Sequence, residues 1–203
     1  MPKLTTPISD EAIRSLKAGD TVELSGIIVT GRDAAHKFMI ERFIKQPVQS
    51  EDEPLHAELK KLLDGGVIYH CGPVVKTHED GSYSFVAAGP TTSIREEVYQ
   101  SDVIRHFNLK GVIGKGGMGA KTLQACQEQP AVYLHAIGGA ASFIAQSVKE
   151  VLEVHLLEFG VPEAMWVIRV EDFPAVVTMD SHGESLHTQI EAQSKQKLAA
   201  LLA

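Results

Sequence analysis

The sequence is short of cysteine and of long hydrophobic runs. It holds only two cysteines, Cys71 and Cys126, in 203 residues, whereas an iron–sulfur cluster usually takes three or four cysteine ligands. No segment reaches the roughly 20 consecutive apolar residues that a transmembrane helix needs, and the first residues lack the apolar stretch of a signal peptide. We therefore expect a cytoplasmic chain with two free thiols, no membrane partner and no iron–sulfur cluster held by its own residues.

Positive charge is also scarce, because the formal net charge is −7 at pH 7. This balance argues against nucleic-acid binding, which depends on cationic side chains that neutralise phosphates. It also gives no general attraction for an anionic substrate. A site for an anion must therefore be built locally, from a few well-placed cations and backbone N–H groups.

The pattern of hydrophobic residues predicts a single layered α/β domain with mixed strands over residues 1–203. The predicted strands are 21–30, 67–70, 82–89, 111–114 and 131–139, with two more in 165–180 around a bend at Pro174. The predicted helices are 9–17, 34–45, 91–107, 120–128, 140–151 and 184–203. Residues 46–60 are irregular and polar, and they are the best candidate for a mobile loop.

A glycine-rich segment follows the strand predicted at 111–114. Residues 114–119 read Gly-Lys-Gly-Gly-Met-Gly and match G-x-G-x-x-G before a predicted helix. A dinucleotide fingerprint also needs an acidic residue at the end of the next strand, and AVYLHAIGG has none. Three readings stay open, namely an anion site formed by Lys115 with the N–H groups of the helix start, nucleotide binding, and a tight turn with a solvated Lys115.

Two arginines stand where strands or loops give way to helices. Arg95 follows Thr91 and Thr92 at the predicted start of a helix, so it either pairs with neighbouring glutamates or binds a carboxylate together with the threonine hydroxyls. Arg32 follows the strand 21–30, and His36 lies four residues later on the same predicted helix face. His36 could act as a base, donate to a substrate or be a satisfied core histidine.

Three segments together carry a family resemblance: Thr30–His36 (TGRDAAH), Gly89–Arg95 (GPTTSIR) and Gly114–Met118 (GKGGM). In order and spacing they resemble the β subunit of class I iron–sulfur fumarases and L-tartrate dehydratases, or the C-terminal domain of single-chain forms. The resemblance extends from about Leu4 to His187. It implies a three-layer β/β/α domain of the swivelling type, with mixed sheets.

The resemblance also implies roles for residues of these segments. Arg32, Arg95 and Lys115 would bind a dicarboxylate, with Gly116 beside them, and Thr91 would take part in proton transfer. Because a bare threonine is a weak base, His36 or a group of the partner could hold that role instead. A 4Fe–4S cluster would be held by a larger α subunit, so the active assembly would be a hetero-oligomer, while the isolated chain could form a homodimer.

The leading hypothesis from the sequence is a hydro-lyase subunit that interconverts fumarate and L-malate. TGRDAAH resembles the fumarase version of that segment, and L(+)-tartrate is the alternative substrate. From another class of protein, the alternative is a non-catalytic nucleotide- or anion-binding module that uses residues 114–119. That module would not depend on Arg32 or Arg95.

Overall fold

Parallel strands form the centre of the molecule in a computed structural model that describes residues 1–202. They are hydrogen-bonded in the order β1 (Lys3–Thr5), β2 (Thr21–Thr30), β3 (Val67–Tyr69), β6 (Gly111–Gly114) and β7 (Val132–His135). Strands β3 and β6 are buried along their whole length, and β7 is buried up to its last residue. Continuous burial of this kind is typical of parallel strands that are covered on both faces.

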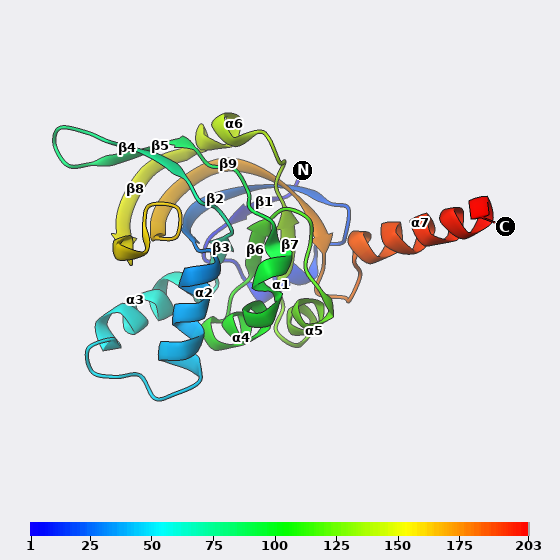
Figure 1. Cartoon of the computed structure of the whole chain (residues 1–203), viewed down its shortest axis with the longest axis horizontal. Helices are drawn as coiled ribbons and strands as arrows, with labels where there is room; N and C mark the ends of the chain where they lie inside the picture. Colours follow the sequence, from blue (N-terminus) through cyan, green and yellow to red (C-terminus); the bar gives the residue numbers. More distant parts are fainter. Residues whose placement is uncertain (203) are drawn as a thin grey trace.

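An antiparallel layer covers one face of these strands (Figure 1). Its long strand β9 (Met165–Met179) pairs with both β2 and β7, and β8 (Val148–His155) pairs with the first part of β9. The hairpin β4 (Val74–Thr77) and β5 (Tyr83–Ala87) lies on the same side, and Tyr83 packs edge-on against Trp166. Strand β9 is continuous through Pro174, and its irregularity lies at Asp172, which has a positive φ of 49°.

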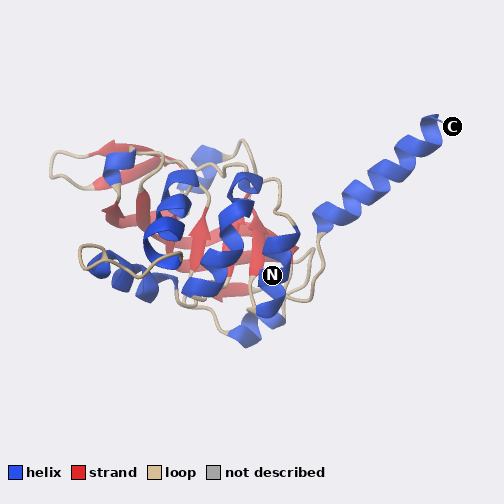
Figure 2. Ribbon diagram, turned by 60° about the horizontal axis from the view of Figure 1, so that its bottom comes forward, coloured by secondary structure: helices blue, strands red, loops and turns tan. Residues whose placement is uncertain are grey.

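Helices form the third layer, on the opposite face of the parallel strands (Figures 1 and 2). They are α2 (Asp33–Met39), its π-helical continuation η1 (Ile40–Ile44), α3 (Glu53–Leu63), α4 (Glu97–Phe107) and α5 (Ala120–Glu128). Alternate residues of the parallel strands point to two separate cores. Tyr69 and Ile113 pack with Trp166 between the parallel strands and the antiparallel strands of the same seven-stranded sheet, whereas Ile68 and Val112 pack under the helices. The α/β class and the β/β/α layering are thereby confirmed, and a swivelling motion stays a prediction.

The predicted helix 140–151 is wrong in its second half. Helix α6 (Ala141–Ala145) is short, and β8 begins at Val148. The partly buried Val148, Val151 and Val154 pack against the core between the sheets, and β8 is hydrogen-bonded to β9. Pairing with a distant strand therefore overrides the local helical pattern.

The remaining elements are short, except for the last helix. They are α1 (Asp10–Arg14), the 3₁₀ turns η2 (Ser93–Glu96) and η3 (Leu157–Phe159), and α7 (Leu186–Leu202). Helix α7 extends away from the layers (Figures 1 and 2), and none of its residues is buried. In the segment 46–60, α3 begins at Glu53, and mobility of this segment stays a prediction. None of the helices within residues 1–202 combines the length and the hydropathy that crossing a bilayer requires.

Candidate functional site

The predicted site residues lie at the edge where the parallel strands end. Arg32 follows β2, and Lys115 follows β6. The segment that contains Thr91 crosses this edge, because its N–H donates to the His70 carbonyl (2.7 Å) and its carbonyl accepts from the Lys115 N–H (3.1 Å). The carboxyl ends of parallel strands are the usual place for ligand sites in α/β proteins. The edge formed by the ends of β2, β3 and β6 is called the carboxyl edge below.

Arg32 is held by a carboxylate that also binds the start of α2. Glu163 Oε1 lies 3.2 Å from Arg32 Nη2, and Glu163 Oε2 accepts from the backbone N–H of Ala34 (3.1 Å). A side chain at Gly72 would displace the guanidinium, since a Cβ atom there would lie 2.5 Å from Arg32 Nη1. The buried Arg32 Nε has no hydrogen-bond partner within residues 1–202, so one donor of this guanidinium is unsatisfied.

Arg95 lies at the same edge and pairs with Asp33, with 2.9 Å between Arg95 Nη2 and Asp33 Oδ2. Its side chain is half exposed, whereas the neighbouring Glu96 side chain is fully buried. Both carboxylate oxygens of Glu96 lack a hydrogen-bond partner in the part of the chain that the structure describes. Burial, helped by the negative charge of Asp33, raises the pKa of Glu96 to about 7. A buried, unsatisfied carboxyl with a pKa near neutrality is typical of functional sites.

Sequence reasoning missed the position of Glu96. The expected pair with Arg95 is present, with 3.9 Å between Arg95 Nη2 and Glu96 Oε1. It was expected at the surface, because glutamate is common and exposed in the first turn of helices. The 3₁₀ turn η2 instead turns Glu96 inward while leaving Arg95 outward. Glu163, the partner of Arg32, was also missed, since 130 residues lie between the two in the sequence and no local pattern links them.

Thr91 and Lys115 are both half-buried and adjacent. Thr91 Oγ1 donates to the His70 carbonyl (3.0 Å), which leaves the lone pairs of the hydroxyl oxygen free to accept a hydrogen bond. Lys115 forms no ion pair within residues 1–202, and its side chain passes beside Gly138. Gly116 follows with a positive φ of 83° in an exposed turn.

His36 lies in a buried polar network beneath the carboxyl edge. Its Nδ1 is 2.9 Å from the Arg32 carbonyl oxygen, and its Nε2 is 2.9 Å from the Gln100 side-chain amide. The same amide is 2.9 Å from His70 Nε2, while His70 Nδ1 is 2.8 Å from Ser93 Oγ. Burial lowers the pKa of both histidines. These contacts favour the core-histidine alternative for His36, in which the ring positions the backbone of Arg32 and the Gln100 side chain.

The helix after the glycine segment is already capped. Oxygens of the Glu97 carboxylate accept from the N–H groups of Gly119 (2.7 Å) and Lys121 (3.0 Å) and from Thr122 Oγ1 (2.6 Å). These are the donors that a bound phosphate would use. Gly117 also packs closely on the His187 ring. Occupation of the α5 start argues against a nucleotide- or anion-binding module at residues 114–119.

The two cysteines do not suit an iron–sulfur cluster. Cys71 belongs to the core between the sheets and Cys126 to the core under the helices. Both are fully buried, and burial raises the pKa of each thiol to about 12. Two inaccessible thiols on opposite faces of one sheet cannot ligate the same cluster.

Comparison with known proteins identifies the family. Residues 3–190 match the family described as Fumarase C-terminus. The chain belongs to the Fumarase C-terminus family. A protein of Geobacillus stearothermophilus named "Putative fumarate hydratase class I" is 54% identical over 196 residues, and the chain spans 35% of its length. The L(+)-tartrate dehydratase subunit beta of Escherichia coli K12 is 39% identical over 184 residues, which are 90% of this chain and 85% of that subunit.

The family match covers the whole candidate site. It includes the ends of β2 and β6, the segment Gly89–Arg95 and the start of α7, and it stops at residue 190 within α7. The resemblance inferred from the three motifs is therefore confirmed at the level of the family. The assignment of roles to individual residues stays a prediction.

Proposed function

We propose that the chain is the β subunit of a class I hydro-lyase that interconverts fumarate and L-malate. The observation that carries this proposal is the meeting of Arg32, Thr91 and Lys115 at the carboxyl edge, with Arg95 beside them. Similarity to a protein named for fumarate hydratase supports the reaction, and similarity to a named subunit beta supports the division into two subunits.

The cations of the carboxyl edge would bind the two carboxylates of the substrate. A guanidinium can hold a carboxylate through two parallel N–H···O bonds, and Asp33 and Glu163 keep Arg95 and Arg32 oriented before substrate arrives. Lys115 would act as a point charge. In a chain with a net charge of −7, such a local group of cations is what attracts a dianion.

Thr91 would take part in moving the proton on the carbon next to a carboxylate. Its hydroxyl donates a hydrogen bond to the His70 carbonyl, so it would act as a base only after a basic group of the partner subunit takes the hydroxyl proton. The Thr91 oxygen would then accept the proton from the substrate carbon. Cations at the adjacent carboxylate would stabilise the negative charge that develops as the proton leaves.

The cofactor of the reaction would belong to the partner. The two thiols of this chain do not fit a 4Fe–4S cluster, so we assign the cluster to an α subunit, where it would supply Lewis-acid chemistry at the substrate hydroxyl. The active form would then be a hetero-oligomer whose site is shared between subunits. L(+)-tartrate is the second candidate substrate, because the chain spans 85% of a tartrate dehydratase β subunit at 39% identity.

Anaerobic assays with and without the partner test the proposal. We expect the chain alone to be inactive, and a mixture with the cluster-bearing α subunit to consume fumarate, followed by its ultraviolet absorbance, and to form L-malate. If the mixture turned over L(+)-tartrate faster than L-malate, L(+)-tartrate would replace L-malate as the first candidate substrate. Absence of turnover with all three compounds, from a mixture that forms a complex by size-exclusion chromatography and retains its cluster, would refute the proposed function.

A further inference from the structure

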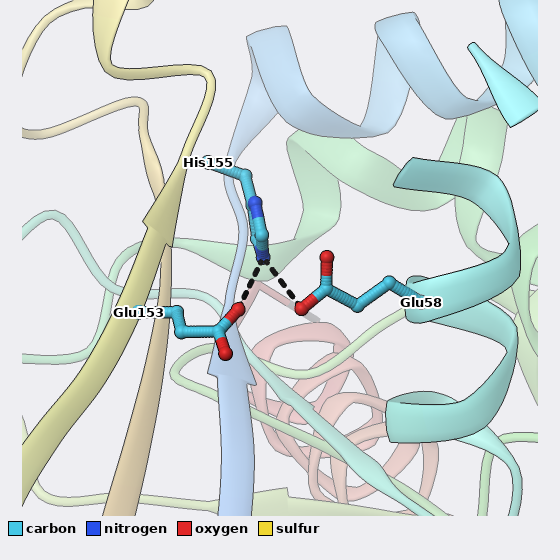
Figure 3. Close-up of side chains that lie close together, drawn as sticks. All are labelled: Glu58, Glu153 and His155. Carbon is cyan, nitrogen blue, oxygen red and sulfur yellow. Dashed lines mark ion pairs between the residues drawn. The ribbon is translucent and has the colours of Figure 1, made fainter. Parts of the chain in front are cut away.

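A second group of polar side chains lies between α3 and β8 and shares no residue with the carboxyl edge (Figure 3). Glu58 extends from α3, while Glu153 and His155 extend from β8, and all three point to one spot. His155 Nε2 lies 3.6 Å from Glu58 Oε1 and 3.5 Å from Glu153 Oε2. One donor atom from each residue lies within 4.8 Å of the other two.

These contacts leave His155 Nε2 without a hydrogen-bond partner and the two carboxylates without a lysine or arginine partner within residues 1–202. The distances to His155 Nε2 exceed those of good hydrogen bonds, and this buried nitrogen has no hydrogen-bond partner within residues 1–202. The two glutamates lie side by side, and no lysine or arginine of residues 1–202 forms an ion pair with either of them. Adjacent carboxylates repel each other unless a proton or a cation lies between them.

The geometry is that of metal ligands. In a tetrahedral zinc site with bonds of about 2.0–2.2 Å to nitrogen and oxygen, neighbouring ligand atoms are about 3.3–3.5 Å apart. The two distances from His155 Nε2, 3.5 and 3.6 Å, are close to this spacing. We propose that Glu58, Glu153 and His155 bind a divalent metal ion, best represented by Zn²⁺, with water as a fourth ligand.

Such an ion would join two layers of the domain. Helix α3 belongs to the helical layer, and β8 is the edge strand of the antiparallel layer. The ion would fix the middle of α3, where Glu58 lies, against that edge. Its role is therefore structural, and it is independent of the reaction proposed for the carboxyl edge.

Zinc titration of the full chain tests the site. The chain is first treated with a chelator and kept in a non-thiol reductant. The neighbouring Glu153 and burial raise the pKa of Glu58 to about 7, so the titration is done at a higher pH. Calorimetry should give one Zn²⁺ per chain. At a hundredfold excess over the dissociation constant, the thermal midpoint should rise by about 5–10 °C.

Two ligand variants and one control decide where the ion binds. Glu153→Gln and His155→Gln should each weaken binding at least about tenfold and remove the thermal shift. Glu153 is exposed, so its variant should fold normally. His56→Gln is the control, because His56 Nε2 lies 2.9 Å from His106 Nε2 and offers zinc a rival pair of imidazoles. Unchanged binding in both ligand variants, loss of binding in the control alone, or no binding by the unaltered chain would overturn the proposal.

Discussion

Glu96 and Glu97 are adjacent in the chain, yet their carboxylates lie in two opposite environments. The oxygens of Glu97 accept hydrogen bonds from the backbone and a hydroxyl at the start of α5. The oxygens of Glu96 are buried beside Arg95 and Asp33 with no hydrogen-bond partner within residues 1–202. Burial of an ionisable group without partners costs stability, whereas a carboxylate at a helix N-terminus adds stability.

The difference separates a structural region from a candidate reactive one. At the start of α5 the hydrogen-bond donors already bind the Glu97 carboxylate. The glycine segment therefore serves mainly to bring Lys115 to the carboxyl edge. At the carboxyl edge itself, Arg32 Nε and both oxygens of Glu96 stay unsatisfied. Substitutions at the edge should therefore alter turnover and titration, and substitutions at α5 should alter stability alone.

The largest effect is expected from Arg95→Met in the assembled enzyme. Loss of the guanidinium removes charge-assisted hydrogen bonds to a substrate carboxylate, and turnover at low substrate concentration should fall by about 10²–10³-fold. The change is measured as kcat/KM for fumarate under anaerobic conditions. Because the Arg95–Asp33 pair is exposed, loss of that pair should change the free energy of unfolding by less than about 1 kcal/mol.

Arg105→Met is the matched control for Arg95. Arg105 lies on α4, is similarly exposed, and pairs with Glu128 at 2.8 Å between Nη2 and Oε2. It lies near the C-terminal end of α4, away from the carboxyl edge. Equal losses of kcat/KM in both variants would mean that exposed arginines of η2 and α4 act through folding or assembly. The carboxyl edge would then not differ from the rest of the surface.

The next effect is a change in the pH dependence of stability in Glu96→Gln. The pKa of Glu96 is raised from 4.5 to about 7 in the folded chain, so between these values the folded state keeps a proton that the unfolded state has lost. Stability must therefore fall as pH rises through this window. Glutamine cannot titrate, and the fall should be smaller in the variant by about 2–3 kcal/mol.

Urea unfolding at several pH values measures this difference. Some fall should persist in Glu96→Gln, because the pKa of Glu58 is also raised to about 7. At acid pH, where Glu96 is protonated in both states, the two chains should be equally sensitive to pH. Parallel pH profiles across the whole window would show that Glu96 is hydrated in solution and not buried as described.

The same contrast shows what sequence can predict. Runs of β-branched residues predicted strand β2, and the glycines predicted the strand, loop and helix at 111–128. The three motifs that contain Arg32, Thr91 and Lys115 predicted the correct family. Two features could not be predicted from the sequence, namely the inward turn of Glu96 and the pairing of Arg32 with Glu163. Both depend on packing between distant segments. Strand β8 was missed for the same reason, because its partner β9 overrides a helical pattern.

A moderate effect on stability alone is expected for Glu97→Ala. The variant leaves the N–H groups of Gly119 and Lys121 and the Thr122 hydroxyl without their acceptor, and the free energy of unfolding should fall by about 2–3 kcal/mol. Chemical denaturation measures the loss. Turnover of the assembled enzyme, assayed well below the unfolding transition, should be nearly normal. A large fall in kcat with unchanged stability would instead place the α5 start in the active site.

The smallest effect is expected for Thr122→Val, which removes one of the donors to Glu97 and preserves the shape of the side chain. The bond from Thr122 Oγ1 to Glu97 Oε2 is 2.6 Å long and partly buried, so its loss should cost about 1–1.5 kcal/mol. In the Glu97→Ala background the same substitution should cost less, because its acceptor is already gone. The difference between the two costs, measured as a double-mutant cycle, gives the coupling energy of the pair. A coupling energy near zero would mean that the backbone N–H groups alone hold Glu97, and the cap would then consist of the N–H groups of Gly119, Lys121 and Thr122 without the hydroxyl.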